Sequence, residues 1–366
     1  MKLGILGGGQ LARMLTLAAY PLGIRTVCLD PVKNPCASEV TKVIHAEFTD
    51  EAAIQSFLSD VDAVTLETEN IPLSTVARLL KTHDFFPSEK ALQISQDRFL
   101  EKSFFTSLAI PTATFRSVNS LDELHQVVPE VGYPCVLKTR RLGYDGKGQY
   151  VLKTPADIIK SWDFIQNQSL ILESFVPFEY ECSLIAVRDK QGHTLFYPLT
   201  LNHHTNGILR SSEAPFNNLA LQKTAEQQAR LLLNELHYVG VLAIEFFYDN
   251  HQLIANEIAP RVHNSGHWTI EGAQVSQFEN QIRAIFGLPL GSTDAIGQSF
   301  LVNCIGNRLP IEDCLAIPGV HYHDYAKTPR AGRKVGHVTL VDSDNARYLK
   351  SKETLSRLLN LENDVE

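Results

Sequence analysis

A glycine-rich stretch near the middle of the chain combines a flexible backbone with positive charge. Gly143, Gly146 and Gly148 follow an apolar run that ends in Lys138, and Lys147 lies among them. Because glycine lets backbone N–H groups approach an anion and lysine neutralises its charge, these residues predict a hairpin whose tip folds over phosphates. The alternative on this stretch alone is an ordinary glycine-rich turn with solvated lysines.

Two glutamates further along the chain predict a metal site. Glu245 and Glu257 lie in mostly apolar segments, and a hairpin that turns near His251 places them opposite each other on one face. Burying two unpaired carboxylates is costly, and Mg2+ bound jointly with nucleotide phosphate is a common remedy. The alternative is that one of the two side chains lies at the surface.

Two further clusters are typical of anion sites. The first lies just before a helix that we expect to start near Thr269, where backbone N–H groups attract anions. Its polar members are Arg261, His263, Asn264, Ser265 and His267. The second is the turn from Lys327 to Lys334, in which four of eight residues are basic. This turn predicts a phosphate partner, with a solvated loop as the alternative.

The N-terminus matches a dinucleotide-binding fingerprint. An expected strand over residues 2–6, the turn from Gly7 to Gln10 and a helix over 11–20 are followed by a strand that ends at Asp30. This is G-x-G-x-x-A with an acid about twenty residues later, and taken alone it predicts NAD binding.

Three polar residues, Glu67, Glu69 and Asn70, follow another expected strand. Open α/β sheets bind ligands at the carboxyl ends of their strands, so these residues are candidates for a site. The equal alternative is that they supply the polar entry to a helix that begins near Pro72.

The periodicity of the chain indicates an α/β and α+β protein that positions these residues. Strands and helices alternate over 1–95, which predicts a small doubly wound domain. One long helical pattern from Ser88 to about Leu108 follows and carries Asp97, Arg98 and Lys102. A second α+β unit over about 110–175 contains the glycine-rich hairpin and is expected to form a lid.

Beyond the lid, the strand 171–176 changes abruptly to polar sequence, where its backbone can pair with an adenine edge and Glu181 with ribose hydroxyls. Strands over 181–187 and 194–201, a helix over 220–236 and the glutamate hairpin complete a domain expected over 96–290. Short strands and a C-terminal helix predict a small β-rich domain over 291–366.

Composition narrows the function classes. The 366 residues are 44% hydrophobic and 20% charged, with a net charge of -8, which argues against a nucleic-acid or anionic-membrane surface. No apolar run approaches the roughly 20 residues of a membrane span. The six cysteines are scattered, so we expect buried free thiols and a reducing cytoplasm.

The order of these motifs resembles the ATP-grasp ligases. More closely, GGGQLARM, ETENI, GYDGKGQ, APRVHNSGHWT and RAGRKVGH are similar to the N5-carboxyaminoimidazole ribonucleotide synthase family, from Leu3 to about Asp342. The resemblance implies an ATP-grasp fold with an N-terminal Rossmann-like (pre-ATP-grasp) domain, a lid subdomain and a small C-terminal β-rich domain. It also implies a homodimer.

For the nucleotide, the resemblance implies three groups of residues. Those on the ATP phosphates would be Arg98, Lys138 and the loop Gly143, Tyr144, Asp145, Gly146, Lys147, Gly148 and Gln149. Those on adenine would be Glu173, Ser174, Phe175 and Val176, with Glu181 on the ribose and His204 and Asn256 lining the pocket. Glu245 and Glu257 would bind Mg2+, although Ala259 stands where many ATP-grasp enzymes have a third, asparagine ligand.

For the other substrates, the resemblance places bicarbonate and carboxyphosphate at Arg261 and His263. Tyr144 and Asp145 would face the aminoimidazole, with Asp145 as a catalytic residue. The ribonucleotide phosphate would be held by Lys327, Arg333 and Lys334.

The implied reaction is ATP- and bicarbonate-dependent carboxylation of 5-aminoimidazole ribonucleotide. Bicarbonate is a poor electrophile and must first be phosphorylated, which requires cations on the γ-phosphate and a shielded intermediate. One alternative is another ATP-grasp ligase, such as a formate-using glycinamide ribonucleotide transformylase or a biotin carboxylase. The others are an NAD-dependent dehydrogenase and a nucleotide-binding regulatory protein.

Overall fold

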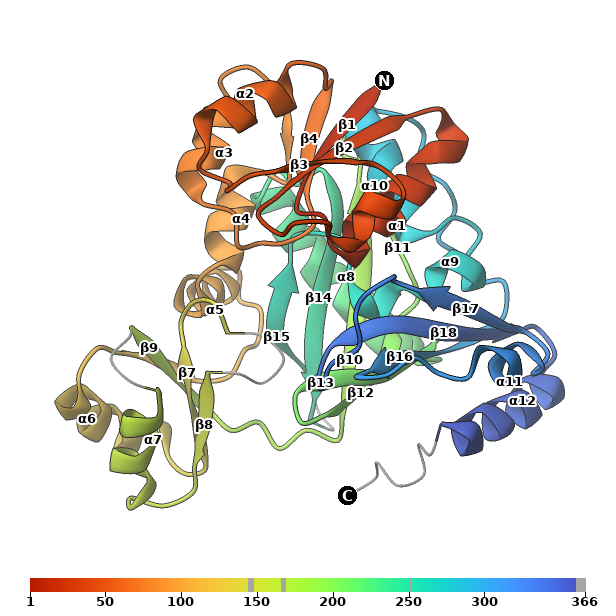
Figure 1. Ribbon diagram of the computed structural model, residues 1–366. Helices are drawn as coiled ribbons and strands as arrows, with labels where there is room; N and C mark the ends of the chain where they lie inside the picture. The colour runs from red at the N-terminus through yellow and green to blue at the C-terminus, as the bar shows by residue number, and fades with distance from the viewer. Residues whose placement is uncertain (144–147, 166–168, 250–251, 360–366) are drawn as a thin grey trace.

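The computed structural model describes residues 1–143, 148–165, 169–249 and 252–359. Figure 1 shows a small N-terminal sheet above a larger central sheet, a separate lid to one side and the C-terminal strands to the other. This arrangement confirms the expected mixture of α/β and α+β architecture.

The N-terminal sheet is parallel and doubly wound, as predicted. Its strands in the described residues are β1 (Lys2–Leu6), β2 (Arg25–Asp30), β3 (Lys42–His45), β4 (Ala63–Leu66) and β5 (Phe85–Phe86), in the order β3-β2-β1-β4-β5. The helices are α1 (Gln10–Ala19), α2 (Glu51–Leu58) and α3 (Leu73–Leu79). Two apolar clusters, one on each face, bury β1 and β4 and explain their continuous hydrophobic sequences.

The single long helix predicted from Ser88 is wrong. The structure has α4 (Glu89–Ser95) and α5 (Arg98–Ser107), separated at Asp97. The Asp97 carboxylate accepts hydrogen bonds from the first N–H groups of α5 and pairs with Arg140 at 2.8 Å. A capping aspartate with extended backbone starts a new helix, and this break directs Arg98 toward the cavity described below.

The lid is an antiparallel sheet with two helices packed on it, in agreement with the expected α+β unit. Its described strands are β6 (Phe115–Val118), β7 (Cys135–Thr139), β8 (Gln149–Leu152) and β9 (Leu170–Ser174), in the order β6-β9-β7-β8. The helices are α6 (Leu121–Val131) and α7 (Asp157–Ile165). Lys138 pairs with Gln149 across β7 and β8, so the glycine-rich stretch does connect a hairpin.

The central sheet carries the glutamate hairpin. Its first strands are β10 (Tyr180–Arg188), β11 (Thr194–Phe196), β12 (Thr200–Thr205), β13 (Ile208–Ala214), β14 (Gly240–Tyr248) and β15 (Leu253–Ala259), and α8 (Leu219–Glu235) packs on one face. The hairpin of β12 and β13 was not predicted. Asn206 and Gly207 both have positive φ there, which is the usual requirement of a two-residue hairpin turn.

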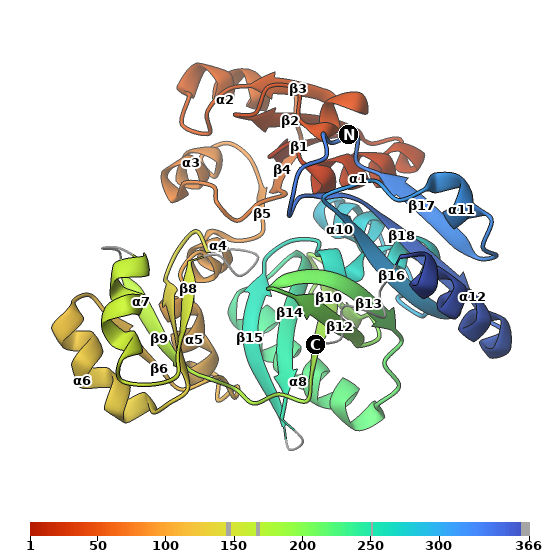
Figure 2. The ribbon, with the colours of Figure 1, turned by 60° about the horizontal axis from the view of Figure 1, so that its bottom comes forward.

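The C-terminal strands extend the same sheet. Among the described strands the order continues β13-β16-β18-β17, with β16 (Gln298–Ile305), β17 (Val320–Asp324) and β18 (Lys334–Asp342). The helices α11 (Ile311–Leu315) and α12 (Asn345–Leu358) pack against these strands. Figure 2 shows these strands and the lid on opposite sides of β14 and β15. The domain boundaries at 95 and 290 stay predictions.

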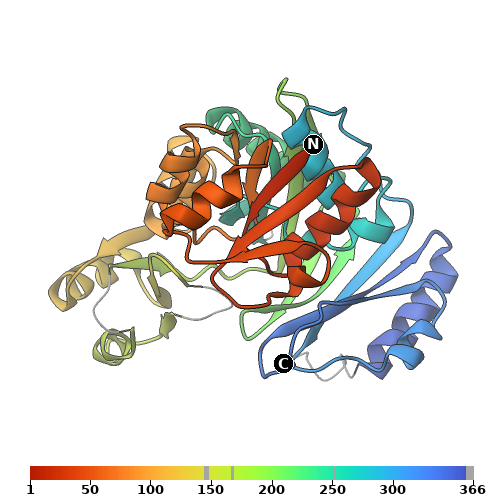
Figure 3. The same ribbon diagram turned by 45° about the horizontal axis from the view of Figure 1, so that its top comes forward.

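The helix expected near Thr269 is short. α9 (Thr269–Gly272) makes a single turn, and α10 (Gln277–Phe286) begins after the capping Ser276. α10 packs between α1 and β14 and so joins the N-terminal domain to the central sheet. Figure 3 shows the molecule with the N-terminal strands and helices in front.

Candidate functional site

One cavity of about 1210 Å³ lies between the lid, the N-terminal sheet, the central sheet and the turn 327–334. Most residues predicted for the site line it: Arg98, Lys138, Gly143, Gln149, Glu173, Ser174, Phe175, Val176, Glu181, His204, Glu245, Asn256, Glu257, Arg261, His263, Lys327, Arg333 and Lys334. Gly148 is described but is not part of this lining. Tyr144, Asp145, Gly146 and Lys147 lie outside the described residues.

Glu173 on β9 holds the lysine of β7. Its buried carboxylate lies 2.9 Å from Lys138 Nζ and 3.8 Å from Lys102 Nζ. Burial alone would raise the pKa of Glu173, but the charges of the two lysines outweigh burial and lower it to about 2. The side chain therefore fixes two cations beside the cavity, and adenine binding by the segment 173–176 stays a prediction.

Lys102 is a site element to which sequence reasoning gave no role. Its side chain is 2% exposed, and Nζ donates to the carbonyl oxygens of Asn256 and Ala255. Lys102 lies one helical turn after Arg98 on α5. The guanidinium of Arg98 pairs with Glu257 at 3.0 Å. The four-residue spacing was visible in the sequence, but the contact of Lys102 with the distant strand β15 was not.

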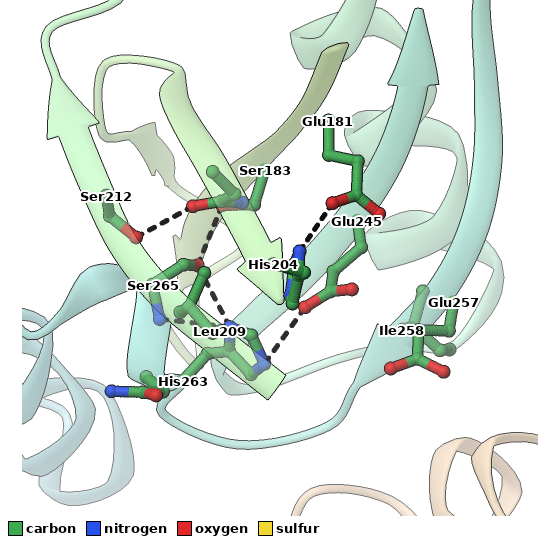
Figure 4. A network of polar contacts seen from close by, with 12 residues as sticks. Glu181, Ser183, His204, Leu209, Ser212, Glu245, Glu257, Ile258, His263 and Ser265 are labelled. Atoms are coloured by element: carbon green, nitrogen blue, oxygen red, sulfur yellow. Dashed lines mark hydrogen bonds and ion pairs between the residues drawn. The ribbon is translucent and has the colours of Figure 1, made fainter. Parts of the chain in front are cut away.

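The two glutamates of the central hairpin face each other as predicted. Glu245 on β14 is the direct cross-strand partner of Glu257 on β15, and a bulge next to this pair leaves Asn256 without a counterpart. Burial and the repulsion of Glu257 raise the pKa of Glu245 to about 7. Figure 4 shows both carboxylates, which line the cavity. The pair fits a cation, which would remove the repulsion.

Glu181 and His204 form a second pair beside this hairpin. His204 Nδ1 lies 2.5 Å from Glu181 Oε2, and both side chains line the cavity (Figure 4). Burial lowers the pKa of His204, but the hydrogen bond of Glu181 and the charges of Glu245 and Glu181 outweigh burial, and the pKa is raised. The structure thus brings together two of the residues predicted for the nucleotide, while their contact with a nucleotide stays a prediction.

His263 is held as a neutral hydrogen-bond donor. Burial, aided by the charge of Arg261, lowers its pKa well below the ordinary value. The backbone N–H of Ser265 donates to Nδ1 at 3.3 Å, so the neutral ring carries its proton on Nε2. Nε2 lies 3.3 Å from Glu245 Oε1, as the dashed line in Figure 4 marks. This atom can donate to an oxyanion in the cavity.

The glycine turn before α1 binds a side chain of this chain rather than a dinucleotide. The N–H groups of Gly9 and Ala12 donate to the Glu67 carboxylate at 2.6 and 3.1 Å. A Cβ at Gly7 would lie 2.3 Å from Glu67 Cγ, so the turn needs glycine for this contact. The NAD interpretation is therefore wrong, because Glu67 takes the helix N-terminus that a pyrophosphate would use.

The basic turn closes the cavity from the C-terminal side. Lys327 Nζ contacts Gln10 Oε1 and lies 5.7 Å from the centre of the Tyr325 ring. Burial lowers the pKa of Lys327. Arg333 donates to the Thr328 carbonyl, and Lys334 begins β18. A cluster of cations at a cavity wall fits an anionic group such as a phosphate.

Comparison with known proteins identifies the family. Family models match the chain as the ribonucleotide synthetase preATP-grasp domain over 1–96, the ATP-grasp domain over 103–278 and the phosphoribosylaminoimidazole carboxylase C-terminal domain over 299–351. The N5-carboxyaminoimidazole ribonucleotide synthase of Pseudomonas aeruginosa is 49% identical over 346 residues, which cover 94% of this chain and 96% of that relative. This chain belongs to the N5-carboxyaminoimidazole ribonucleotide synthase family.

Solved structures of N5-carboxyaminoimidazole ribonucleotide synthases have the same fold. The Thermus thermophilus enzyme has a TM-score of 0.93 and 47% identity, covering 97% of this chain and 98% of its own. The Aspergillus clavatus enzyme, in complex with ADP and 5-aminoimidazole ribonucleotide, has a TM-score of 0.89 and 29% identity, covering 98% of each chain. The predicted ATP-grasp fold with pre-ATP-grasp and C-terminal domains is thereby confirmed.

The synthase cavity also contains residues for which the sequence gave no firm role. Gln10, Glu67, Glu69, Gln96 and Glu101 all line it. The position of Glu67 and Glu69 after a strand was a visible signal, whereas their partners in distant segments were not. Burial, followed by repulsion from Glu257, raises the pKa of Glu101 to about 8.

Proposed function

We propose that this chain carboxylates 5-aminoimidazole ribonucleotide to N5-carboxyaminoimidazole ribonucleotide in de novo purine biosynthesis. The reaction consumes ATP and bicarbonate and releases ADP and phosphate. Bicarbonate oxygen attacks the γ-phosphorus and displaces ADP. The exocyclic amine then attacks the resulting carboxyphosphate, or the CO2 released from it, and phosphate is the leaving group in either case. The catalyst is an ATP-dependent carbon–nitrogen ligase.

One observation carries the proposal. A single cavity joins the cations of α5 and β7, the glutamate pair, the Arg261–His263 corner and the basic turn. A homologue of the same fold was solved with ADP and 5-aminoimidazole ribonucleotide, the two ligands that such a cavity has to hold together. ATP binding is supported in addition by the family match over 103–278.

We assign the ATP end of the cavity to Arg98, Lys138 and the glycine-rich loop. Arg98 and Lys138 are already oriented by Glu257 and Glu173, so little side-chain freedom is lost when phosphates bind. The segment 173–176 would take adenine and Glu181 the ribose, with His204 and Asn256 beside them. Loop residues 144–147 would complete the phosphate site.

We assign Mg2+ to Glu245 and Glu257. The facing carboxylates and the raised pKa of Glu245 fit a divalent cation. Within the described residues there is no group of three or more His, Cys, Asp or Glu side chains that could hold a metal, so the remaining ligands would come from the nucleotide and water. Bound Mg2+ would neutralise phosphate charge during transfer.

We assign bicarbonate and carboxyphosphate to Arg261 and the Nε2–H of His263. Both groups donate hydrogen bonds, and Arg261 also supplies positive charge for an oxyanion. Tyr144 and Asp145 would face the aminoimidazole, where Asp145 would accept the amine proton as the C–N bond forms. Lys327, Arg333 and Lys334 would bind the 5′-phosphate.

We further propose that the chain forms a homodimer, as the family resemblance implies, and that it is cytoplasmic. All six cysteines are free and buried, which fits a reducing compartment. None of the helices in the described ranges has the length and apolar character needed to span a bilayer.

A ribonucleotide-dependence assay tests the function. ADP release is measured with ATP, Mg2+ and bicarbonate, and only the acceptor is varied between 5-aminoimidazole ribonucleotide and glycinamide ribonucleotide. The proposal expects rapid ADP release with the first acceptor alone. Equal stimulation by glycinamide ribonucleotide with formate would favour the transformylase instead.

A further inference from the structure

Glu69 lies in the loop after β4 and reaches a residue from the far end of the central hairpin. Its two carboxylate oxygens accept hydrogen bonds from Arg261 Nε and Nη2 at 2.7 and 3.0 Å. Both side chains are largely buried and both line the cavity. A bidentate pair of this kind fixes the plane of the guanidinium as well as its position.

The backbone of Glu69 is itself anchored. Gln96, between α4 and α5, donates from Nε2 to the carbonyl oxygens of Glu69 and Ile71 at 2.7 and 2.6 Å. The carboxylate is charged as well as oriented. Burial raises the pKa of Glu69, but the charge and hydrogen bonds of Arg261 outweigh burial and lower it.

The contact determines which donors of Arg261 face a substrate. Nε and one N–H of Nη2 bind Glu69, and Nη1 donates to the Val262 carbonyl at 3.2 Å. Of the five N–H groups of a guanidinium, the contacts made by the described residues leave one on each Nη. Two donors at this end of the group match the two oxygens of a planar anion such as bicarbonate.

Other carboxylates compete for the same cation. Burial lowers the pKa of Arg261, and Glu69 makes the largest contribution that raises it. The charges of Glu67 and Glu257 raise this pKa further, by smaller amounts. Without Glu69, the guanidinium would be drawn toward the α1 cap or toward the glutamate assigned to Mg2+. A long arginine side chain loses considerable conformational entropy when it is fixed. Because Glu69 already fixes Arg261, this entropy is not lost again when the substrate binds.

From this geometry we infer that Glu69 is a positioning residue, which holds Arg261 with its outer N–H pair turned toward bicarbonate. The inference rests on the proposed function, since it assumes that Arg261 binds bicarbonate. It assigns to the N-terminal domain a direct part in preparing the carboxylation site. The ETENI motif thereby gains two roles, with Glu67 on the α1 turn and Glu69 on Arg261.

Glu69→Gln tests the inference, because glutamine keeps the size of the side chain but offers only one acceptor oxygen and no charge. Initial rates are measured with bicarbonate varied at saturating ATP and ribonucleotide, and then with ATP varied. We expect the KM for bicarbonate to rise on the order of 10–100-fold, the range found for residues that orient metal ligands in the same way, with little change in the KM for ATP. Glu69→Asp, which keeps the charge, should recover part of the loss.

Two comparisons make the result decisive. Glu235→Gln removes a half-exposed partner of Lys90 and should behave like the unmodified chain. If Glu69 only joins two domains, Glu69→Gln will lower thermal stability and change both KM values together, and the inference is overturned. Arg261→Lys separates the proposed bicarbonate site from the proposed role of Glu69. If Arg261→Lys leaves the bicarbonate dependence unchanged, the proposed bicarbonate site is wrong. If Arg261→Lys changes that dependence and Glu69→Gln does not, only the role of Glu69 is overturned.

Discussion

Replacing Lys138 with methionine removes the charge nearest to the buried Glu173 carboxylate and keeps most of the side-chain length. The lowering of the Glu173 pKa from 4.5 to about 2 corresponds to about 3 kcal/mol of stabilisation at neutral pH, since one pH unit is worth about 1.4 kcal/mol. Lys138, at 2.9 Å, makes the largest favourable contribution, and Lys102 remains at 3.8 Å. We therefore expect Lys138→Met to reduce the free energy of unfolding of the lid region by about 2 kcal/mol.

The stability lost in Lys138→Met should depend on pH. A carboxyl whose pKa is depressed in the folded state stabilises the protein above its unfolded pKa and loses that contribution as the pH falls through the folded value. The difference between the two proteins should be largest at neutral pH and shrink from pH 4.5 toward about 2. Urea unfolding of the nucleotide-free protein, followed by fluorescence of Trp162 on α7 in the lid, measures it.

The same substitution tests the placement of ATP. A lysine on the transferred phosphate acts in both the ground state and the transition state, so Lys138→Met should raise the ATP requirement and lower kcat while ribonucleotide binding changes little. Lys90→Met, which breaks the half-exposed pair with Glu235, is the matched control and should change neither property. A shift confined to the ribonucleotide, or an unfolding free energy within about 0.5 kcal/mol of the unmodified chain, would refute the reasoning.

Three further predictions concern the rest of the cavity. Glu257→Gln should nearly abolish ADP release at ordinary Mg2+, because one of the two carboxylates proposed to bind the cation is lost. Thermal stability without nucleotide should hold, because the repulsion with Glu245 is removed together with the ion pair to Arg98; calorimetry and the ADP assay check both. Asp145→Asn should uncouple the reaction, with ADP released but little carboxylated product, and tight coupling would contradict its role as base. Arg333→Ala should raise the ribonucleotide requirement by about one to two orders of magnitude at an unchanged ratio of ADP to product, and a shift in ATP dependence instead would argue against a phosphate contact.

Local pattern was sufficient to predict several elements. The spacing of Glu245 and Glu257 within apolar strands predicted their cross-strand pairing, because side chains alternate along a strand and the turn fixes the register. Most of the cavity lining followed from the family resemblance, which supplied residue roles that no spacing could give. The N-terminal sheet followed from the alternation of apolar runs and helices.

Other features depend on contacts between distant segments. Arg261 and Glu69 are separated by 192 residues, and Lys102 meets Asn256 across 154 residues, so neither pairing could be read from local sequence. The glycine turn is ambiguous for a related reason, since Gly7 and Gly9, which in a dinucleotide fingerprint admit a pyrophosphate, here admit the side chain of Glu67. The break at Asp97 is different, because an aspartate that caps a helix is a local signal that the continuous apolar pattern obscured; its carboxylate also pairs with Arg140, a residue of the lid segment.

The most direct test of the proposed carboxylation follows labelled bicarbonate and ADP in one reaction. The account predicts that the label enters N5-carboxyaminoimidazole ribonucleotide in a one-to-one ratio with ADP, and only when ATP and 5-aminoimidazole ribonucleotide are both present. Labelled product without ATP consumption, or ADP release by the intact chain that is indifferent to the ribonucleotide, would contradict it.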